Sequence, residues 1–96
     1  MYTALYLDQI LVDIIEAKIW YKEQNSGLEI KFAVAIENAI NKILVMPTMY
    51  APRYKNIRIA HPITFPYNIH FYINEVEKEV IFTAVVHNKR GLEFID

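Results

Sequence analysis

The sequence of 96 residues contains no cysteine, two glycines and no apolar run near the length of a membrane span. Without cysteine the chain can form no disulfide and no cysteine-ligated metal site, which fits a reducing compartment. A membrane-spanning helix needs about 20 apolar residues in succession, and no stretch approaches that length. The N-terminus also lacks the basic flank and apolar centre of a signal peptide. We therefore expect a cytoplasmic protein with no membrane segment.

The composition provides the material for one apolar core. Hydrophobic residues make up 54% of the chain and aromatic residues 14%. A chain of this length suits one domain, residues 1–96, which would bury roughly 60–70% of the surface that its unfolded form exposes. The formal net charge of −1 argues against a strongly basic nucleic-acid binder.

Acidic residues are missing from one long stretch of the sequence. Between Tyr50 and Asn74 there is no aspartate or glutamate, yet Arg53, Lys55 and Arg58 lie there. Two interpretations follow: a local positive patch on a neutral protein, or solvated charges around a turn.

The first half of the sequence is typical of a strand followed by a helical hairpin. A short apolar run from Tyr2 to Leu7 predicts the strand. Apolar residues at helical spacing then predict a helix from Asp8 to Gln24. Ser26 followed by Glu29 forms a capping-box pattern for a second helix, which should run to about Met46 before Pro47. The short connection favours an antiparallel pair.

Beyond Pro52 the apolar residues alternate, which predicts strands. We expect them at 57–64, 69–73 and 80–86, with Pro62 at an edge or a bulge. The last of these is almost entirely apolar, as in a central strand covered on both faces. Residues 92–96 could add an edge strand or fray. The predicted fold is α+β in the order β-α-α-β-β-β, with a helical hairpin packed on one face of a small, mostly antiparallel, curved sheet.

Several short segments of the sequence occur in a characteristic order and spacing: Asp13-Ile14-Ile15-Glu16-Ala17, Trp20-Tyr21, Gln24, Gly27-Leu28, Phe32, Met46-Pro47, Ile57-Arg58, Phe65-Pro66-Tyr67-Asn68-Ile69 and Ala84-Val85-Val86-His87 with Arg90. Together they resemble the RelE/ParE toxin superfamily, from Tyr2 to about Gly91. Most of these positions also have a purely structural interpretation as packing or turn residues, so the resemblance identifies the scaffold first.

The resemblance implies the toxin component of a type II toxin–antitoxin (plasmid stabilisation) system, neutralised by a cognate antitoxin. One branch of the superfamily cuts messenger RNA on the ribosome without a metal, and the other inhibits DNA gyrase by binding. The near-neutral charge of this chain favours the branch that inhibits DNA gyrase by binding. A non-toxic interaction module with the same fold is the alternative, and a homodimer or a hetero-oligomer with the antitoxin are both open.

For RNA cleavage, histidine suits proton transfer and arginine suits the phosphate charge. The resemblance assigns Arg58 and Arg90 to the phosphate and His87 to proton transfer. Lys55 would assist electrostatically, and His70 and Tyr72 are weaker candidates for contact with RNA or another target. The histidines show no metal-ligand spacing, so we predict neither a metal nor another cofactor.

Strand parity predicts which of these side chains share a face of the sheet. If the isoleucines of the strand at 57–64 face the helices, Arg58 faces away from them. His70, Tyr72 and His87 would lie on the same open face as Arg58, provided that no bulge shifts the alternation. The same parity exposes Ile81, Thr83 and Val85, an apolar surface that would need a partner.

Each candidate also has a structural interpretation. His87 would only cap nearby groups, Arg58 would only pair with a carboxylate, and His70 would be a cross-strand neighbour at the surface.

Overall fold

The computed structural model describes residues 1–91, and the side chains of residues 1–89. The elements in chain order are β1 (Thr3–Tyr6), α1 (Asp8–Gln24), α2 (Leu28–Val45), the 3-10 turn η1 (Pro47–Met49), β2 (Pro52–Tyr54), β3 (Ile57–Ala60), β4 (Tyr67–Asn74), β5 (Glu79–His87) and α3 (Asn88–Gly91). The predicted α+β order is confirmed, with one additional short strand, β2. The edge strand considered for 92–96 lies outside the described residues.

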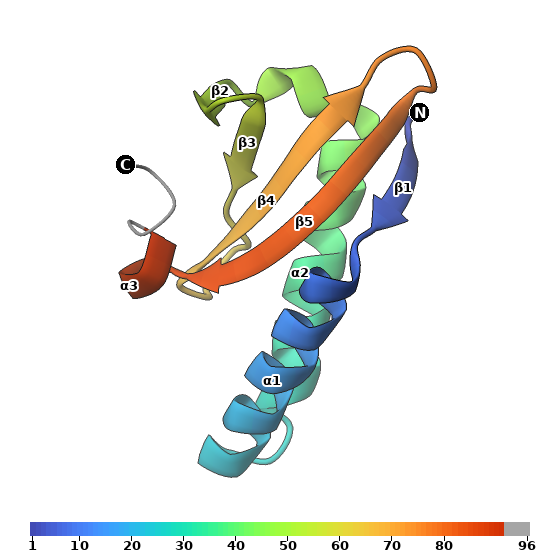
Figure 1. Cartoon of the computed structure of the whole chain (residues 1–96). Helices are drawn as coiled ribbons and strands as arrows, with labels where there is room; N and C mark the ends of the chain where they lie inside the picture. Colours follow the sequence, from blue (N-terminus) through green and yellow to red (C-terminus); the bar gives the residue numbers. More distant parts are fainter. Residues whose placement is uncertain (92–96) are drawn as a thin grey trace.

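The strands form one sheet in the order β1-β5-β4-β3-β2, drawn across the upper part of Figure 1. All neighbouring strands are antiparallel except β1, which pairs in parallel with the first half of β5. The first strand therefore joins the sheet as predicted. β5 lies inside the sheet, and its residues Val80, Ile81 and Phe82 are buried, as expected for a central strand.

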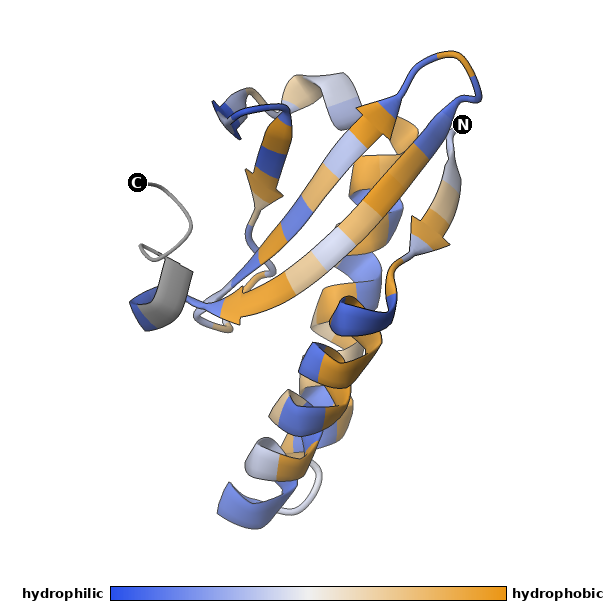
Figure 2. Ribbon diagram, viewed as in Figure 1, coloured by the Kyte–Doolittle hydropathy of each residue, from blue (hydrophilic) through white to orange (hydrophobic). Residues whose placement is uncertain are grey.

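The helical hairpin packs on one face of the sheet and extends beyond it (Figure 1). The core between these layers contains the fully buried side chains Ile10, Phe32, Ile43, Phe71 and Phe82. Each such side chain contributes about 1.5–3 kcal/mol relative to an exposed one. Orange and blue residues are mixed along the hairpin in Figure 2, because α1 also exposes apolar side chains such as Leu11, Ile15 and Ile19.

The start of α2 differs from the predicted capping box. Gly27, with φ of 100°, is the residue before the helix, and no side chain caps it. The Glu29 carboxylate accepts a hydrogen bond from the Gly27 amide at 2.8 Å, so one half of the box is present at a shifted position. The predicted role of Ser26 is wrong, because the left-handed glycine moves the start of the helix beyond it.

A bulge in β5 reverses the predicted facing of its second half. His70 pairs with Ala84 and Phe71 pairs with Phe82, so Thr83 is an extra residue without a cross-strand partner. Before the bulge Phe82 faces the helices, and after it Val85 does, as part of the same core cluster. The prediction that Val85 and His87 face away from the helices is therefore wrong.

The facing of β3 is also the reverse of the prediction. Arg58 pairs with Phe71 and Ala60 pairs with Ile69, and these partners belong to the core under the helices. Directly opposite residues in paired strands share a face, so Arg58 lies on the helical side and Ile59 faces away beside His70. The small Ala60 fits this packed layer, whereas the larger isoleucine is buried on the other face.

The apolar surface expected at Ile81 and Val85 is not exposed. Ile81 is 3% exposed and Val85 4% exposed, the latter because the bulge turns it into the core. Within residues 1–91, no helix is long and apolar enough to cross a membrane.

Candidate functional site

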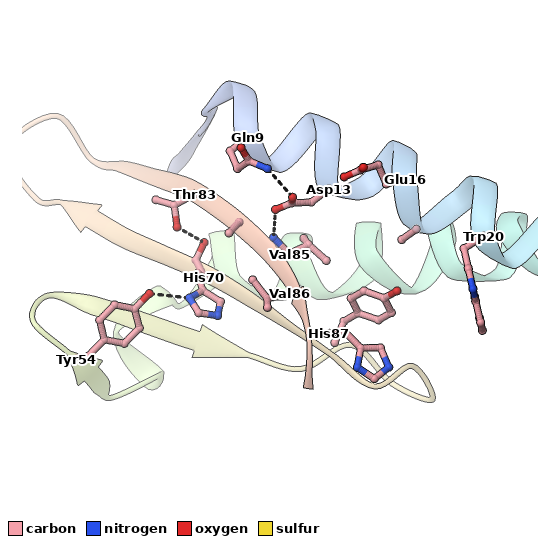
Figure 3. A pocket seen from close by; sticks show the side chains of 13 residues that line it. Gln9, Asp13, Glu16, Trp20, Tyr54, His70, Thr83, Val85, Val86 and His87 are labelled. Atoms are coloured by element: carbon pink, nitrogen blue, oxygen red, sulfur yellow. Dashed lines mark hydrogen bonds between the residues drawn. The ribbon is translucent and has the colours of Figure 1, made fainter. Parts of the chain in front are cut away.

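A cleft of about 770 Å³ opens where α1 runs beside the second half of β5 (Figure 3). β1 pairs with residues 79–82 of β5 only, so the next residues of that strand edge lie next to α1 rather than next to a strand. The cleft is lined by Gln9, Asp13, Glu16, Ala17, Trp20, Tyr54, Tyr67, His70, Thr83, Ala84, Val85, Val86 and His87. We call this the α1–β5 cleft.

Asp13 joins the two walls of the α1–β5 cleft. Its Oδ2 accepts a hydrogen bond from the backbone amide of Val85 at 3.0 Å, and its Oδ1 accepts from Gln9 Nε2 at 2.8 Å. The first bond satisfies an edge amide that β1 is too short to reach. The aspartate thus holds α1 against the strand edge and blocks that edge to another strand at this position.

The α1 wall follows from helical spacing. Gln9, Asp13, Glu16 and Trp20 recur at intervals of four, three and four residues, which places them on one side of a helix. Figure 3 shows these side chains along the side of α1 that borders the cleft. Trp20 is 53% exposed at the far end and offers a large aromatic surface.

His70 lies on the other face of the sheet, 1% exposed, and meets Tyr54 of β2. Its Nδ1 and the Tyr54 hydroxyl are 2.8 Å apart in a hydrogen bond, and the two rings meet edge to face. Burial lowers the pKa of His70, and His61 lowers it further, while the Asp13 carboxylate acts in the opposite direction. Burial likewise raises the pKa of Tyr54. The pair is therefore uncharged at neutral pH, and His70 is not the surface side chain that the structural interpretation supposed.

His87 lines the end of the cleft from the helical side of the sheet. Its ring packs edge to face on the ring of Tyr67. Burial raises the pKa of the Tyr67 hydroxyl. The Nδ1 of His87 accepts a hydrogen bond from the backbone amide of Lys89 at 3.1 Å. The neutral ring therefore carries its proton on Nε2, and the capping interpretation of this residue matches the contact observed.

The remaining predicted residues lie elsewhere. Arg58 donates from Nη1 to the carbonyl oxygen of Tyr50 at 2.6 Å, on the helical face and away from the cleft lining. Lys55 is exposed in the turn between β2 and β3, and Tyr72 faces away from the helices next to Ile81. Arg90 falls in α3, and its side chain lies outside the described part of the chain. The structure brings His70 and His87 to one cleft without Arg58, and the roles of all these residues stay predictions.

The charges of the α1–β5 cleft are acidic. Asp13 and Glu16 line it, and none of the lysine or arginine side chains among residues 1–89 does. Among the side chains of residues 1–89, a phosphate in this cleft would meet carboxylates and no lysine or arginine, which is electrostatically unfavourable. Within the described residues no three histidine, aspartate or glutamate side chains form a group that could hold a metal ion.

Sequence reasoning missed the α1 wall of the cleft. Asp13 and Glu16 were matched as part of the resemblance, yet only as the polar side of a helix. The spacing of Gln9, Asp13, Glu16 and Trp20 was the available signal, because it puts polar groups and a tryptophan on one side. What could not be read is that this side would border β5.

No protein-family model matches the sequence, and no curated protein matches it significantly. Among solved structures, the chain is similar to one in "Chromosomal ParDE TA system from P. aeruginosa", with a TM-score of 0.78 and 13% sequence identity. The match covers 91% of this chain and 96% of that chain. The likeness shows a shared fold, so the RelE/ParE-like fold implied by the sequence is confirmed.

Proposed function

We propose that this chain is the toxin component of a toxin–antitoxin pair, and that it acts in the cytoplasm by binding a protein target rather than by cutting RNA. The fold it shares with a chain of a ParDE system supports the first part. The resemblance noted in the sequence implies a cognate antitoxin and, for the binding branch, an enzyme of the DNA gyrase type as target.

The observation that carries the choice of mechanism is the acidic lining of the α1–β5 cleft. Cleavage through a 2′-hydroxyl requires a cation on the phosphate and a nearby group that takes a proton. His87 lines the cleft, but Arg58 lies on the helical face and donates to Tyr50 instead. Asp13, Glu16 and the exposed Trp20 suit a protein surface that presents cations and an apolar side chain.

The test compares growth and message integrity after induced expression. The double variant His87→Asn with Arg58→Gln removes the ring assigned to proton transfer and one of the two guanidinium groups assigned to the phosphate, and it leaves Arg90 in place. Asparagine still accepts from the Lys89 amide, as residues before helices commonly do, and glutamine still donates to the Tyr50 carbonyl. We expect both the unaltered chain and the double variant to arrest growth to the same extent. Primer extension on cellular messages should show no new ends with either.

A matched change within the cleft completes the design. Glu16→Lys with Trp20→Ala alters the exposed side of α1, and we expect it to abolish growth arrest while circular dichroism shows a folded chain. New message ends that vanish in the double variant would refute the binding mechanism. No growth arrest in any host lacking the antitoxin would instead favour a non-toxic interaction module.

A further inference from the structure

One side of α1 exposes a row of apolar side chains to solvent. The row, which we call the α1 stripe, follows helical spacing and consists of Leu11, Val12, Ile15 and Ile19. These side chains are between 47% and 57% exposed. The buried residues of the helix lie elsewhere around its axis: Ile10, Ala17 and Tyr21. A single exposed apolar residue needs no explanation, but a row of them along one helix indicates a contact surface.

The α1 stripe has charges of opposite sign at its two ends. Asp8 lies three residues before Leu11 in the first turn of the helix, and Lys22 lies three residues after Ile19 in the last turn. Both charged side chains are exposed. Residues three or four apart are neighbours on a helix surface, so both charges lie in line with the stripe.

The stripe and its charges are placed symmetrically about Ile15. Leu11 and Ile19 lie four residues before and after it, and Asp8 and Lys22 lie seven residues before and after it. Two antiparallel copies of α1 that meet at Ile15 would therefore place Leu11 of each copy on Ile19 of the other. The same arrangement places Asp8 of each copy beside Lys22 of the other. Parallel copies would bring like charges together at both ends, so the charges specify the antiparallel direction.

We propose that two copies of this chain associate through their α1 stripes, with the helices antiparallel and a two-fold axis beside Ile15. The contact from Asp8 to Lys22 would be about 21 Å long, with the helix axes about 8–10 Å apart. One helix pair buries less surface than a standard protein interface, so we expect a dimer that dissociates in the micromolar range. The inference does not depend on the proposed function.

A dimer of this form presents both α1–β5 clefts on one side. The α1 wall of the cleft lies about 130° around the helix from the stripe, so the second copy leaves the wall uncovered. The two-fold axis is perpendicular to both helices, and rotation about it keeps the two clefts on the same side of the dimer. A target with two equivalent sites would therefore bind the dimer more tightly than a single chain.

The first test is sedimentation velocity of the purified full chain between about 1 and 200 µM. Ile15→Lys places a like charge from each copy at the two-fold axis and should weaken the dimer at least about tenfold. The matched control is Ile30→Lys on an exposed position of α2, which should change the dissociation constant less than about twofold.

Exchange of the two charges tests the antiparallel contact itself. Asp8→Lys or Lys22→Asp alone should weaken the dimer about fivefold, because each change acts at two symmetric contacts. The two changes combined restore opposite charges between copies and should return the dissociation constant to within about twofold of the unaltered chain. Both changes oppose the helix dipole, so an effect confined to one helix would instead add up in the combined variant.

Cysteine substitution tests the position of the axis, since the chain has no cysteine of its own. Under mild oxidation Ile15→Cys should form a covalent dimer several times faster than Leu11→Cys, whose counterpart in the other copy is Ile19. A monomer at every concentration would overturn the proposal, as would a dimer that Ile30→Lys dissociates and Ile15→Lys does not. A combined charge variant weaker than either single one, or equal cross-linking of the two cysteine variants, would also overturn it.

Discussion

Replacing Asp13 by alanine should destabilise the protein because it removes a hydrogen bond between α1 and β5, two elements that are distant in the sequence. The bond to the Val85 amide is 3.0 Å long and partly buried, and Val85 itself is 4% exposed. A buried hydrogen bond to a charged group contributes about 1.5–3 kcal/mol. The higher helix propensity of alanine offsets up to about 0.7 kcal/mol of this loss in the free energy of unfolding. We therefore expect a net loss of about 1–2 kcal/mol in the free energy of unfolding, and a fall in Tm of about 4–8 °C per kcal/mol.

Urea unfolding curves at neutral pH measure this loss. Asp13→Asn keeps an oxygen that can accept from Val85, so it should recover about half of the loss. Gln9→Ala removes the second partner of Asp13, and Glu16→Ala removes a carboxylate from the same side of α1 without touching the Val85 bond. Both controls should stay within about 0.5 kcal/mol of the unaltered chain. An Asp13→Ala variant as stable as these controls would refute the reasoning.

Two further predictions concern stability. Burial lowers the pKa of His70 below 6.5, so its contribution to folding is complete above about pH 6.5 and is lost as the pH falls through the folded-state pKa. Urea curves between about pH 7.5 and pH 5 should therefore show a decline that His70→Gln flattens. His61→Gln should reduce this decline much less, because burial is the larger cause of the His70 shift; an equal reduction by both changes would contradict this. Gly27→Ala should cost about 1–2 kcal/mol because φ is 100°, although no atom lies within 4 Å of the added methyl group. Gly27→Asn should cost less in the same assay, and equal costs would point to a cause other than backbone strain.

The helices and strands could be predicted because each depends on residues close together in the sequence. The helix expected from Asp8 to Gln24 has these bounds in the structure, and the strands after Pro52 appear in the expected order. Amphipathic spacing encodes these elements directly. The strand expected over 57–64 is shorter in the structure: β3 ends at Ala60, and Pro62, which cannot donate a hydrogen bond to a neighbouring strand, lies beyond it.

The facing of the strands could not be predicted because it depends on pairing between distant residues. The extra residue Thr83 in β5 has nothing unusual in its local sequence, and only the register with β4 reveals it. One such residue moves His87 to the opposite face. In β3, the choice between Arg58 and Ile59 for the helical side depends on which fits beneath α2, and both faces of that strand contain buried residues.

The candidate site was predictable only in parts. His70 and His87 were chosen for their chemistry, and both line the α1–β5 cleft. Asp13 could not be paired with Val85, since they are 72 residues apart and the bond involves a backbone amide that any residue could supply. Helical spacing identifies a polar side of α1, but the shortness of β1 decides what that side meets.

The parallel pairing of β1 with β5 has a consequence for the order of events during protein synthesis. Thr3 pairs with Glu79, so the first strand leaves the ribosome long before its partner exists. Contacts between residues so distant in sequence also slow folding, because closing the intervening chain costs entropy before any contact offsets it. A chain truncated before β5 would have the helical hairpin but no strand for β1 to pair with and no Phe82 beside Phe71. We expect such nascent chains to need protection from aggregation.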